Sequence, residues 1–489
     1  MKKLLLEEIF VTEGIPQYTF VKPPNYNEIL LDIRRKGKPV IIEGQSGTGK
    51  TTTAKRIINQ LSADIDVNYL TARQSIDLER IIEITKTKES GYYIIDDFHR
   101  LSNDLQQELA NIAKTAAETQ DERLPKLIII GINQVGASLI NMVHDIAKRC
   151  GIHRIEPGNK EIITNLINSG AEKLNVQFEN PERIYEESKG DYWLTQTLCQ
   201  TICTKNDVLN FQEAIKIINF QLEDIRQSMV RKLSHSYKEP VKEFSRGRRF
   251  RPSNDPYFKL LRLISSQKGS IVDLNELANA NEEMRASING IKERRLNILL
   301  ESKPICSRYF FYNSENKNFA IEDPALFYYM KHVDWEEIRK DCGFRDDIES
   351  KEFEISISFA GENRNLARYI AEQFEQIDVP VFYDELYESN YLGKAWSKEF
   401  ERIFLKDSRY VICLLDSFHK NKIWPNFERD CFKKRVPNGD VIPIYLDDTI
   451  FVGIPDDIVG IKYEWSEDNI SWQEEVQDKI VFKIWEKLE

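Results

Sequence analysis

The sequence lacks an apolar run of about 18 residues, the shortest stretch that is typical of a membrane-spanning helix. We therefore expect no part of the chain to cross a membrane. Residues 1–11 hold two lysines and a short apolar run, but Glu7 and Glu8 interrupt that run and no small-residue cleavage site follows, which argues against a signal peptide. The chain also has no tandem repeat with a period of about 20–50 residues, which argues against a repeat array.

Cysteines number only seven, an odd count, and they stand in apolar contexts. Cys199 and Cys203 are four residues apart and could share a helix face with a metal, but no nearby His or Cys completes a ligand set. We therefore expect buried thiols and a reducing, cytoplasmic location.

Positive charge is in deficit, since 68 Lys and Arg face 79 Asp and Glu for a formal net charge of −11. This balance argues against indiscriminate binding to nucleic acid or anionic membranes, although a local basic patch is compatible with it. A hydrophobic content of 41% and a charged content of 30% are those of ordinary globular domains. A chain of 489 residues has room for about three of them.

The first third of the chain alternates between apolar strands and helical patterns. Residues 39–43, 92–95 and 127–130 are short β-rich runs, and a helical pattern such as 105–116 separates them. Continuous apolar strands between helices predict a parallel α/β sheet. After Pro157 the pattern is helical to about Met229.

Two further regions follow. The stretch 228–252 breaks the helical pattern; three short helices and a hairpin then predict a winged helix. From Phe353 to the end, five strands alternate with helices, which predicts a second doubly wound α/β domain of flavodoxin-like type.

The strongest motif is GQSGTGKT, which directly follows the first predicted strand. It consists of Gly44, Gln45, Ser46, Gly47, Thr48, Gly49, Lys50 and Thr51. In such a P-loop the glycines let backbone N–H groups face the phosphates, Lys50 reaches the β and γ phosphates, and Thr51 binds Mg²⁺. The sequence therefore predicts binding of ATP or ADP with Mg²⁺.

Acidic and polar residues at strand ends extend this site. Asp96 and Asp97 end the second buried run, where Asp96 is placed to hold the Mg²⁺ shell and Asp97 to orient a water. Asn133 follows the next strand and is either a γ-phosphate sensor or a simple turn former. Arg149 and Arg154 are candidate phosphate contacts, or else surface arginines.

These motifs resemble the NTPase core of the STAND class over residues 9–160. The resemblance implies that Pro157 packs on the adenine, that residues 14–21 recognise it, and that residues 190–199 form a lid helix. It also implies that His332, at the end of the winged helix, senses the nucleotide. In this class ADP holds the winged helix closed, and exchange for ATP opens the chain for oligomerisation.

The C-terminal domain resembles a TIR domain, on the segments ISISFAGENR, VPVFYD, GKAW, RYVICLLD and the Trp424–Glu428 spacing. Some TIR domains are scaffolds, and others cleave NAD⁺ with one glutamate on the third helix. The resemblance implies Glu428 as the catalytic residue, although a surface acid would fit the spacing as well. The NAD-binding residues that it implies are Phe359, Ala360, Asp384, Trp396 and Trp424. Asp384 is alternatively a structural acid at a strand end.

The expected domains combine these predictions. They are an NTPase core (1–157), a helical lid (158–227), a basic linker (228–255), a winged helix (256–334), a second linker (335–351) and a TIR domain (352–489). The basic linker has eight Lys or Arg against two acids in 228–252. It is interpreted as a linker or inter-domain contact, as the source of an arginine for a neighbour's nucleotide, or as a nucleic-acid contact.

The hypothesis that follows is an immune effector that oligomerises through its NTPase and TIR domains and then depletes NAD⁺. A separate sensor or a phage-derived trigger protein would activate it. The alternatives are a TIR scaffold without enzymatic activity and a nucleic-acid-dependent ATPase of the origin-recognition type.

Overall fold

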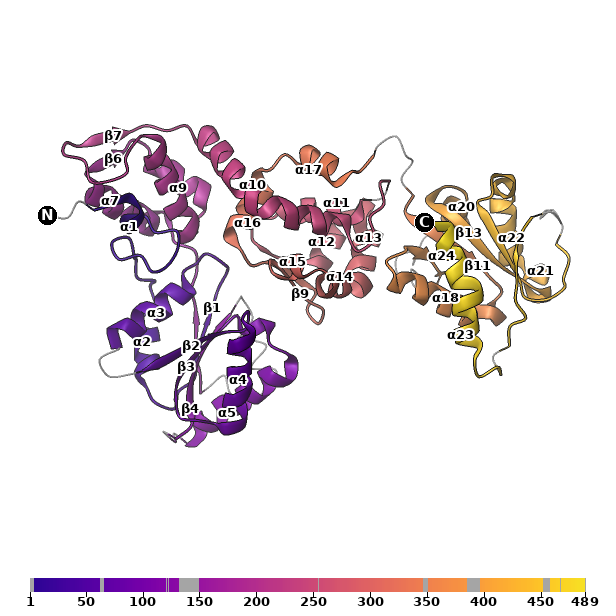
Figure 1. Ribbon diagram of the computed structural model, residues 1–489, viewed down its shortest axis with the longest axis horizontal. Helices are drawn as coiled ribbons and strands as arrows, with labels where there is room; N and C mark the ends of the chain where they lie inside the picture. The colour runs from indigo at the N-terminus through magenta and orange to yellow at the C-terminus, as the bar shows by residue number, and fades with distance from the viewer. Residues whose placement is uncertain are drawn as a thin grey trace. The chain divides into compact units, whose positions relative to one another are not determined.

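The computed structural model describes residues 4–61, 66–119, 121, 123–131, 149–253, 255–345, 351–384, 396–451, 458–466 and 468–488, without the side chains of Ala286, Trp396, Ile423 and Trp424. These residues form two compact units (Figure 1). The first comprises 1–235, 268–270 and 321–332, and the second 236–267, 271–320 and 333–489. Among the described residues, no helix is long and apolar enough to cross a membrane.

A five-stranded parallel sheet forms the base of the first unit, in the order β2-β3-β4-β1-β5. Its strands are β1 (Val40–Glu43), β2 (Val67–Thr71), β3 (Gly91–Asp96), β4 (Pro125–Gly131) and β5 (Gly151–Arg154). Three of them are the predicted apolar runs, and β4 is buried along its whole length. The prediction of a parallel α/β sheet is confirmed.

Helices cover both faces of this sheet because alternate strand residues point to opposite sides. Ile42, Ile94 and Ile128 pack with α2 (Tyr26–Arg34) and α3 (Lys50–Leu61) on one face. Ile41, Ile95 and Ile129 pack on the other with α4 (Ser75–Thr87) and α5 (Asn103–Thr119). Because the strands are parallel, their carboxyl ends lie at one edge of the sheet.

A helical lid with its own core completes the first unit. It contains α1 (Leu6–Ile9), α7 (Lys160–Leu174), α8 (Pro181–Ser188) and α9 (Tyr192–Lys205), with short strands β6 (Val176–Phe178) and β7 (Lys216–Ile218). Cys199 and Cys203 lie fully buried in this core, and burial raises the pKa of the Cys203 thiol to about 12. All seven cysteines are free and buried, as predicted for thiols.

The predicted break after Met229 is wrong. A single helix, α10 (Leu222–Arg246), runs through most of the segment predicted as a basic linker, with Pro240 inside it. Lys, Arg and Glu are good helix formers, and proline costs only one hydrogen bond and local strain. Burial of Phe244 against Tyr257 and Phe310 offsets that cost.

The predicted helices and hairpin follow α10. They are α11 (Pro256–Ser265), α12 (Leu274–Ala280), α13 (Arg285–Gly290), α14 (Leu296–Ser302) and α15 (Pro304–Ser307), and a sheet with the order β8-β10-β9. Its strands are β8 (Ile271–Asp273), β9 (Phe310–Asn313) and β10 (Asn318–Ile321). This is the element order expected of a winged helix. Helices α16 (Pro324–His332) and α17 (Trp335–Cys342) come next, so the predicted linker 335–351 begins as a helix.

The C-terminal part of the second unit is a parallel sheet in the order β12-β11-β13-β14-β15. Its strands are β11 (Phe353–Ser358), β12 (Val381–Phe382), β13 (Ser408–Leu415), β14 (Val441–Tyr445) and β15 (Ile461–Lys462). Counted along this domain the order is 2-1-3-4-5, the flavodoxin-like arrangement that the sequence predicted.

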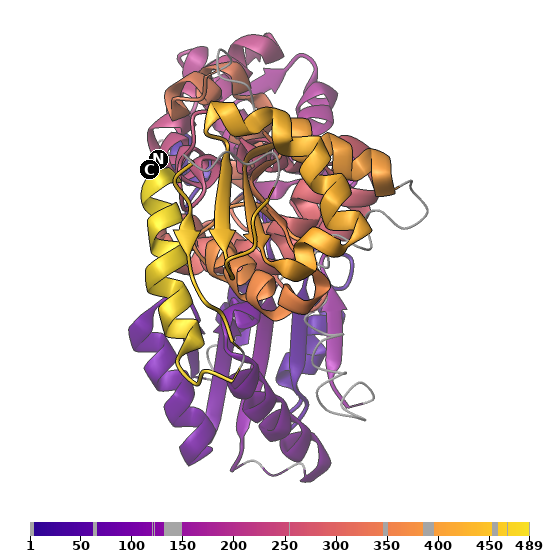
Figure 2. The same ribbon diagram turned by 90° about the vertical axis from the view of Figure 1, so that its right-hand side faces the viewer.

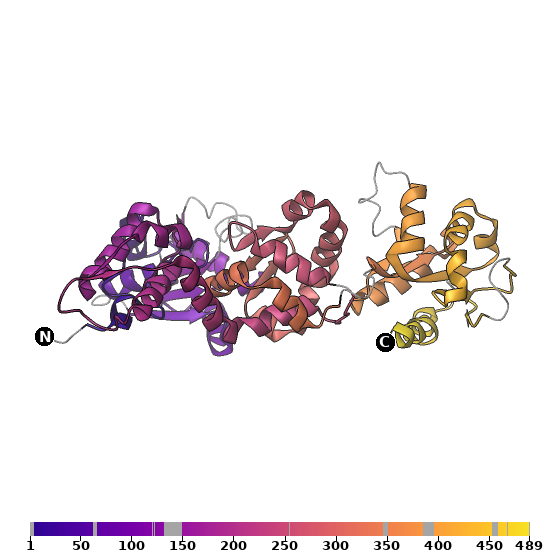
Figure 3. The ribbon, with the colours of Figure 1, turned by 90° about the horizontal axis from the view of Figure 1, so that it is seen from above.

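Helices lie on both faces of this second sheet. Helices α18 (Arg364–Gln376), α23 (Trp472–Val476) and α24 (Phe482–Leu488) pack on one face. Helices α20 (Trp396–Arg402) and α22 (Ile423–Phe432) pack on the other. Figure 2 shows the yellow helix α24 on one side of the gold strands, and Figure 3 shows the same separation from above.

Arginines of the basic segment make contacts inside the second unit. Arg248 donates to the carbonyl of Gln376 at 2.6 Å, and Arg251 donates to the carbonyl of Asp378 at 2.5 Å. Beside them Arg295 forms a buried, two-pronged pair with Glu375, at 2.8 and 2.9 Å. These contacts favour the interpretation of the segment as an inter-domain contact.

Candidate functional site

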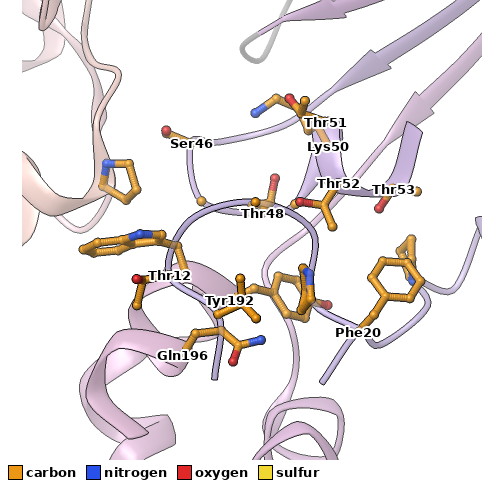
Figure 4. Close-up of a pocket in the computed structure, with 18 of the residues that line it drawn as sticks. Thr12, Phe20, Ser46, Thr48, Lys50, Thr51, Thr52, Thr53, Tyr192 and Gln196 are labelled. Carbon is orange, nitrogen blue, oxygen red and sulfur yellow. The ribbon is translucent and has the colours of Figure 1, made fainter. Parts of the chain in front are cut away.

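The first unit contains a cavity of about 380 Å³ at the carboxyl edge of its sheet. Its walls are the P-loop and the start of α3 (46–53), the segment 11–23, the lid helix α9 and residues after β3. Figure 4 shows Phe20, Gln196 and Thr48 around this space, each from a different one of these elements. The glycine loop, the predicted adenine segment and the lid therefore meet, as the sequence predicted.

Two glycines shape the P-loop. Gly47 and Gly49 both have φ of +81°, which a residue with a side chain rarely adopts. A Cβ atom at Gly47 would lie 2.1 Å from Oδ2 of Asp191, the residue that caps α9 by accepting from the Leu194 N–H at 2.8 Å. The loop and the lid can thus touch only because residue 47 is glycine.

Lys50 is held against its own loop. Its Nζ donates to the carbonyls of Gly44 and Gln45 at 3.0 and 2.7 Å, so these two residues fix the lysine rather than line the cavity. Burial lowers the pKa of Lys50 to about 8, against the opposing effect of Asp96 and Asp97. A phosphate group entering the cavity would add negative charge and favour the ammonium form of Lys50 further.

Thr51 and Asp96 form the predicted pair for Mg²⁺. The Thr51 hydroxyl donates to Oδ2 of Asp96 at 2.8 Å, and the Tyr69 hydroxyl donates to the same oxygen at 2.6 Å. A hydroxyl and a carboxylate oxygen are the hard ligands that Mg²⁺ binds. The residues fit the ion, and Tyr69 is a partner that the sequence did not single out.

Asp97 is held by an arginine at the cavity wall. It lines the cavity in the left-handed region, with φ of +56°, and both of its oxygens accept from Arg73, at 2.8 and 3.0 Å. Although burial acts to raise it, these hydrogen bonds hold the pKa of Asp97 below its usual value. Arg73 is therefore a partner of Asp97, and the Thr71 hydroxyl donates to Asp97 as well, at 2.9 Å.

Glu322 is a residue that sequence reasoning missed. It is buried, lines the cavity and contacts His99 and Arg100, while its backbone carbonyl accepts from the Ser46 hydroxyl. It also lies 3.4 Å from Arg73. No signal in the sequence pointed to it, because Glu322 stands ten residues before His332 and an acidic side chain is not expected beside phosphate groups.

Asp97, His99 and Glu322 lie close enough together to suggest a metal site. Arg73 contacts both carboxylates, however, and Arg100 contacts Glu322 as well. Burial lowers the pKa of His99 to about 3. With two guanidinium groups already pairing the carboxylates, this cluster is a network of ion pairs rather than a cation site.

Several predicted nucleotide contacts do not line the cavity. Pro157 packs beside Gly190 instead, with its Cβ 3.0 Å from an ideal Cβ there. His332 lies 3.5 Å from Glu187 of the lid helix α8. Arg149 pairs with Glu118, and Arg154 pairs with Glu156. Asn133 lies outside the described residues.

The C-terminal domain has its own cavity, of about 660 Å³, at the carboxyl ends of its strands. In open α/β sheets this edge is where ligands bind. The lining residues are Ile357, Phe359, Gly361, Arg364, Asp384, Phe400, Asn421, Lys422, Pro425 and Glu428.

Glu428 lies at the buried side of this cavity, with 8% of its surface exposed. Burial raises its pKa to about 8, the Ser358 hydroxyl lowers it by donating to Oε2 at 2.6 Å, and the charge of Asp384 raises it. A carboxyl group with a raised pKa in a cleft is a typical sign of a functional site. The predicted catalytic residue is thus in a position to act on a ligand.

A cation and an aromatic ring face the same cavity. Arg364 donates to both oxygens of Asp384 at 3.3 and 3.4 Å, and its guanidinium lies 5.4 Å from the ring centroid of Phe359. Asp384 therefore pairs with a cation at the cavity wall. Of the residues predicted to bind NAD, Phe359 and Asp384 line the cavity, while Ala360 is fully buried and does not line it.

Two predicted NAD-binding residues remain, Trp396 and Trp424. The side chains of Trp396 and Trp424 are not among the described ones, although Trp396 begins α20 and Trp424 lies near the start of α22. Arg364 and Lys422 were not predicted. Both stand in strongly polar segments, GENR and HKNK, where sequence alone does not distinguish a cavity residue from a surface one.

Comparison with known proteins gives partial matches. Residues 20–145 match the family model described as novel STAND NTPase 3. One curated relative, the 3′ cyclic ADP-D-ribose synthase AaTIR of Aquimarina amphilecti, is 33% identical over 108 residues, which is 22% of this chain and 33% of the relative. Another, the Holliday junction branch migration complex subunit RuvB of Sulfurimonas denitrificans, is 27% identical over 191 residues, which is 36% of this chain and 55% of the relative. The chain thus spans about a third and about half of the length of these relatives.

Solved structures with some likeness include the Thermotoga maritima RuvB Holliday junction branch migration motor and the Aeropyrum pernix ORC2 protein. The first has 17% identity and a TM-score of 0.34, and covers 65% of this chain and all of that one. The second has 11% identity and a TM-score of 0.35, and covers 68% of this chain and 96% of that one.

Proposed function

We propose that the chain is an immune effector in which a STAND-type NTPase switch controls a C-terminal TIR domain that cleaves NAD⁺. The observation that carries the proposal is the buried Glu428 carboxyl at a cavity shared with Phe359 and Arg364. The matches to a STAND NTPase model and to a 3′ cyclic ADP-D-ribose synthase support its two halves.

The cavity suits the chemistry of a nicotinamide riboside. Loss of neutral nicotinamide leaves an oxocarbenium-like ribosyl cation, which an adjacent carboxylate stabilises. Glu428 supplies that carboxylate, Phe359 offers a flat apolar surface, and Arg364 and Lys422 offer positive charge for the diphosphate. Addition of water to the ribosyl carbon gives ADP-ribose and one proton, whereas attack by a hydroxyl of the same molecule gives a cyclic product.

The nucleotide cavity supplies the control. In our proposal ADP keeps the chain inactive, and ATP with Mg²⁺ at Lys50, Thr51 and Asp96 promotes a homo-oligomer through the NTPase and TIR domains. A separate sensor or a phage-derived protein is the proposed trigger.

The test uses the full chain with NAD⁺, with and without ATP and Mg²⁺, and identifies the products by chromatography. Glu428→Gln is expected to lower nicotinamide release by about 10²–10⁴-fold, the usual contribution of a positioned carboxyl. Lys50→Ala is expected to remove the stimulation by ATP. The matched controls are the exposed Glu486→Gln on α24 and Lys173→Ala on α7, which should change neither result. Intact NAD⁺ in an oligomerised sample would show a scaffold instead.

The RuvB match favours a second candidate, a nucleic-acid-dependent ATPase. This candidate requires salt-sensitive DNA binding through residues 246–251. The test is to neutralise those arginines and to measure DNA binding by gel shift. An unchanged shift would rule out this surface as the DNA-binding site.

A further inference from the structure

Ser358 connects the Glu428 carboxyl to a second buried group. Its hydroxyl, at the end of β11, donates to Oε2 of Glu428 at 2.6 Å and lies 3.1 Å from Nε2 of His419. Ser358 and His419 are both fully buried. His419 belongs to α21 (Ser417–Asn421), so three elements bring these side chains together.

In the ionised form of Glu428, which the reaction needs, the carboxylate can only accept hydrogen bonds. The Ser358 hydroxyl has one hydrogen and gives it to Glu428, so the contact with His419 then requires an N–H on Nε2. Burial lowers the pKa of His419 to about 4, so the imidazole is neutral and Nδ1 carries no proton. Within the described part of the chain Nδ1 has no hydrogen-bond partner, which agrees with this tautomer.

The backbone around His419 is also fixed. Asp416 caps α21 by accepting from the His419 N–H at 2.7 Å, and Asn363 donates to the other oxygen of Asp416 at 2.7 Å. The backbone that carries the imidazole is therefore fixed by contacts that do not involve a ligand.

Building on the proposed function, we propose that Ser358 is a positioning residue for Glu428, and that His419 sets the direction of the Ser358 hydroxyl. The chain of hydrogen bonds runs from imidazole to hydroxyl to carboxyl. It engages Oε2, so Oε1 is the oxygen left to face the ribosyl cation in the cavity.

The donated hydrogen bond also favours the ionised form of Glu428, which the reaction needs. Other charges and thiols influence this network. The charge of Asp384 raises the pKa of Glu428, and the charge of Glu428 raises the pKa of Cys413 and of Cys431. Arg429 lowers the pKa of His419. Each of them stays in place when the Ser358 hydroxyl is removed. Loss of the Ser358 hydroxyl should therefore change the titration of Glu428.

Ser356 provides a matched control. It lies two residues earlier in β11, on the same face of the strand, and is equally buried. Within the described residues its hydroxyl has no hydrogen-bond partner. Ser356→Ala therefore removes the same atom as Ser358→Ala without removing a contact to Glu428.

The experiment measures nicotinamide release by the full-length protein across pH. Ser358→Ala is expected to lower kcat about 10-fold near neutral pH and to move the acidic limb upward by about one pH unit, because one charge-assisted hydrogen bond is lost. His419→Phe should shift the limb in the same direction, and His419→Gln, which keeps an N–H donor, should restore it in part. Ser356→Ala should leave the limb in place.

An unmoved limb in Ser358→Ala, with wild-type protein active, overturns the inference and leaves the proposed function standing. Wild-type protein that leaves NAD⁺ intact overturns the proposed function instead. In that case infrared spectroscopy tests the inference. The carboxyl band that is present in the wild type and absent in Glu428→Gln belongs to Glu428. Its titration midpoint must rise in Ser358→Ala, and an equal midpoint refutes the positioning role.

Discussion

The raised pKa of Glu428 predicts a specific dependence of stability on pH. Burial raises this pKa from 4.5 to about 8 in the folded chain, whereas the unfolded chain keeps the ordinary value. Between these two pH values the folded state binds one proton more than the unfolded state. The contribution of Glu428 to stability is therefore fully present below about pH 4.5 and is lost as pH rises through about 8.

The size of the effect follows from the proton balance. Each pH unit between the two pKa values is worth about 1.4 kcal/mol. From about pH 5 to about pH 9, the wild type should lose about 4 kcal/mol relative to Glu428→Gln, which does not titrate. The amide introduced by Glu428→Gln keeps an oxygen that accepts from Ser358, so the variant should fold at both pH values.

Urea unfolding followed by tryptophan fluorescence measures this difference. Trp193 is in the first unit and the other six of the seven tryptophans are in the second, so the signal reports mainly on the second unit. Other titrating groups are common to both proteins and cancel in the comparison. Glu486→Gln should follow the wild type, since that residue is exposed. Parallel curves for wild type and Glu428→Gln would refute the idea that Glu428 is protonated on folding.

Three further predictions concern packing and nucleotide binding. Arg295→Met and Glu375→Gln should each cost about 3 kcal/mol in urea unfolding, because each breaks a buried, two-pronged ion pair, and the double variant should cost less than the sum. Lys126→Met should lower stability by about 3 kcal/mol in the same assay, since Lys126 donates to the carbonyls that end α2, two of them at 2.8 Å. Gly47→Ala should weaken ATP binding about 10-fold or more by calorimetry, because the new methyl group meets Asp191, and Asp191→Ala should restore part of the affinity.

Each of these has an outcome that contradicts it. Additive costs in the Arg295 and Glu375 cycle would mean that the pair is not coupled. A loss in Lys173→Met as large as that in Lys126→Met would point to a general charge effect, because Lys173 is exposed. Unchanged ATP affinity in Gly47→Ala would mean that loop and lid separate in the nucleotide-bound chain.

The nucleotide cavity was predictable where its chemistry is local. The order of residues 44–51 fixes the loop, and a parallel sheet brings its strand ends to one edge, so Thr51 and Asp96 had to meet. The contact is 2.8 Å between side chains 45 residues apart. Tyr69 was missed because its strand, β2, was not among the predicted apolar runs, and only two of its five residues are buried.

His332 lies away from the cavity for a different reason. The resemblance implied a histidine at the end of a helix, but His332 lies 3.5 Å from Glu187 of the lid, and its ring packs against Tyr328 of its own helix, α16. Glu322, ten residues earlier, lies in the cavity instead. An acidic residue was not expected at this position, because nucleotide sites usually present cations to phosphate. Its partners Arg73 and Arg100 stand in helical and loop segments that carry no recognisable motif.

The environment of Glu428 shows where sequence reasoning ends. The helix and the carboxyl of Glu428 could be assigned from spacing. Its hydrogen-bond partner Ser358 is 70 residues away along the chain, and His419, which contacts Ser358, is 61 residues from Ser358. Their meeting depends on the register that pairs Ser358 with Cys413 across β11 and β13, and on the turn between α21 and α22. A shift of one residue in that register would turn the Ser358 side chain to the other face of the sheet. The pKa of Glu428 is therefore a property of the tertiary fold, which is why variants at Ser358, and not the motif around Glu428, test it most directly.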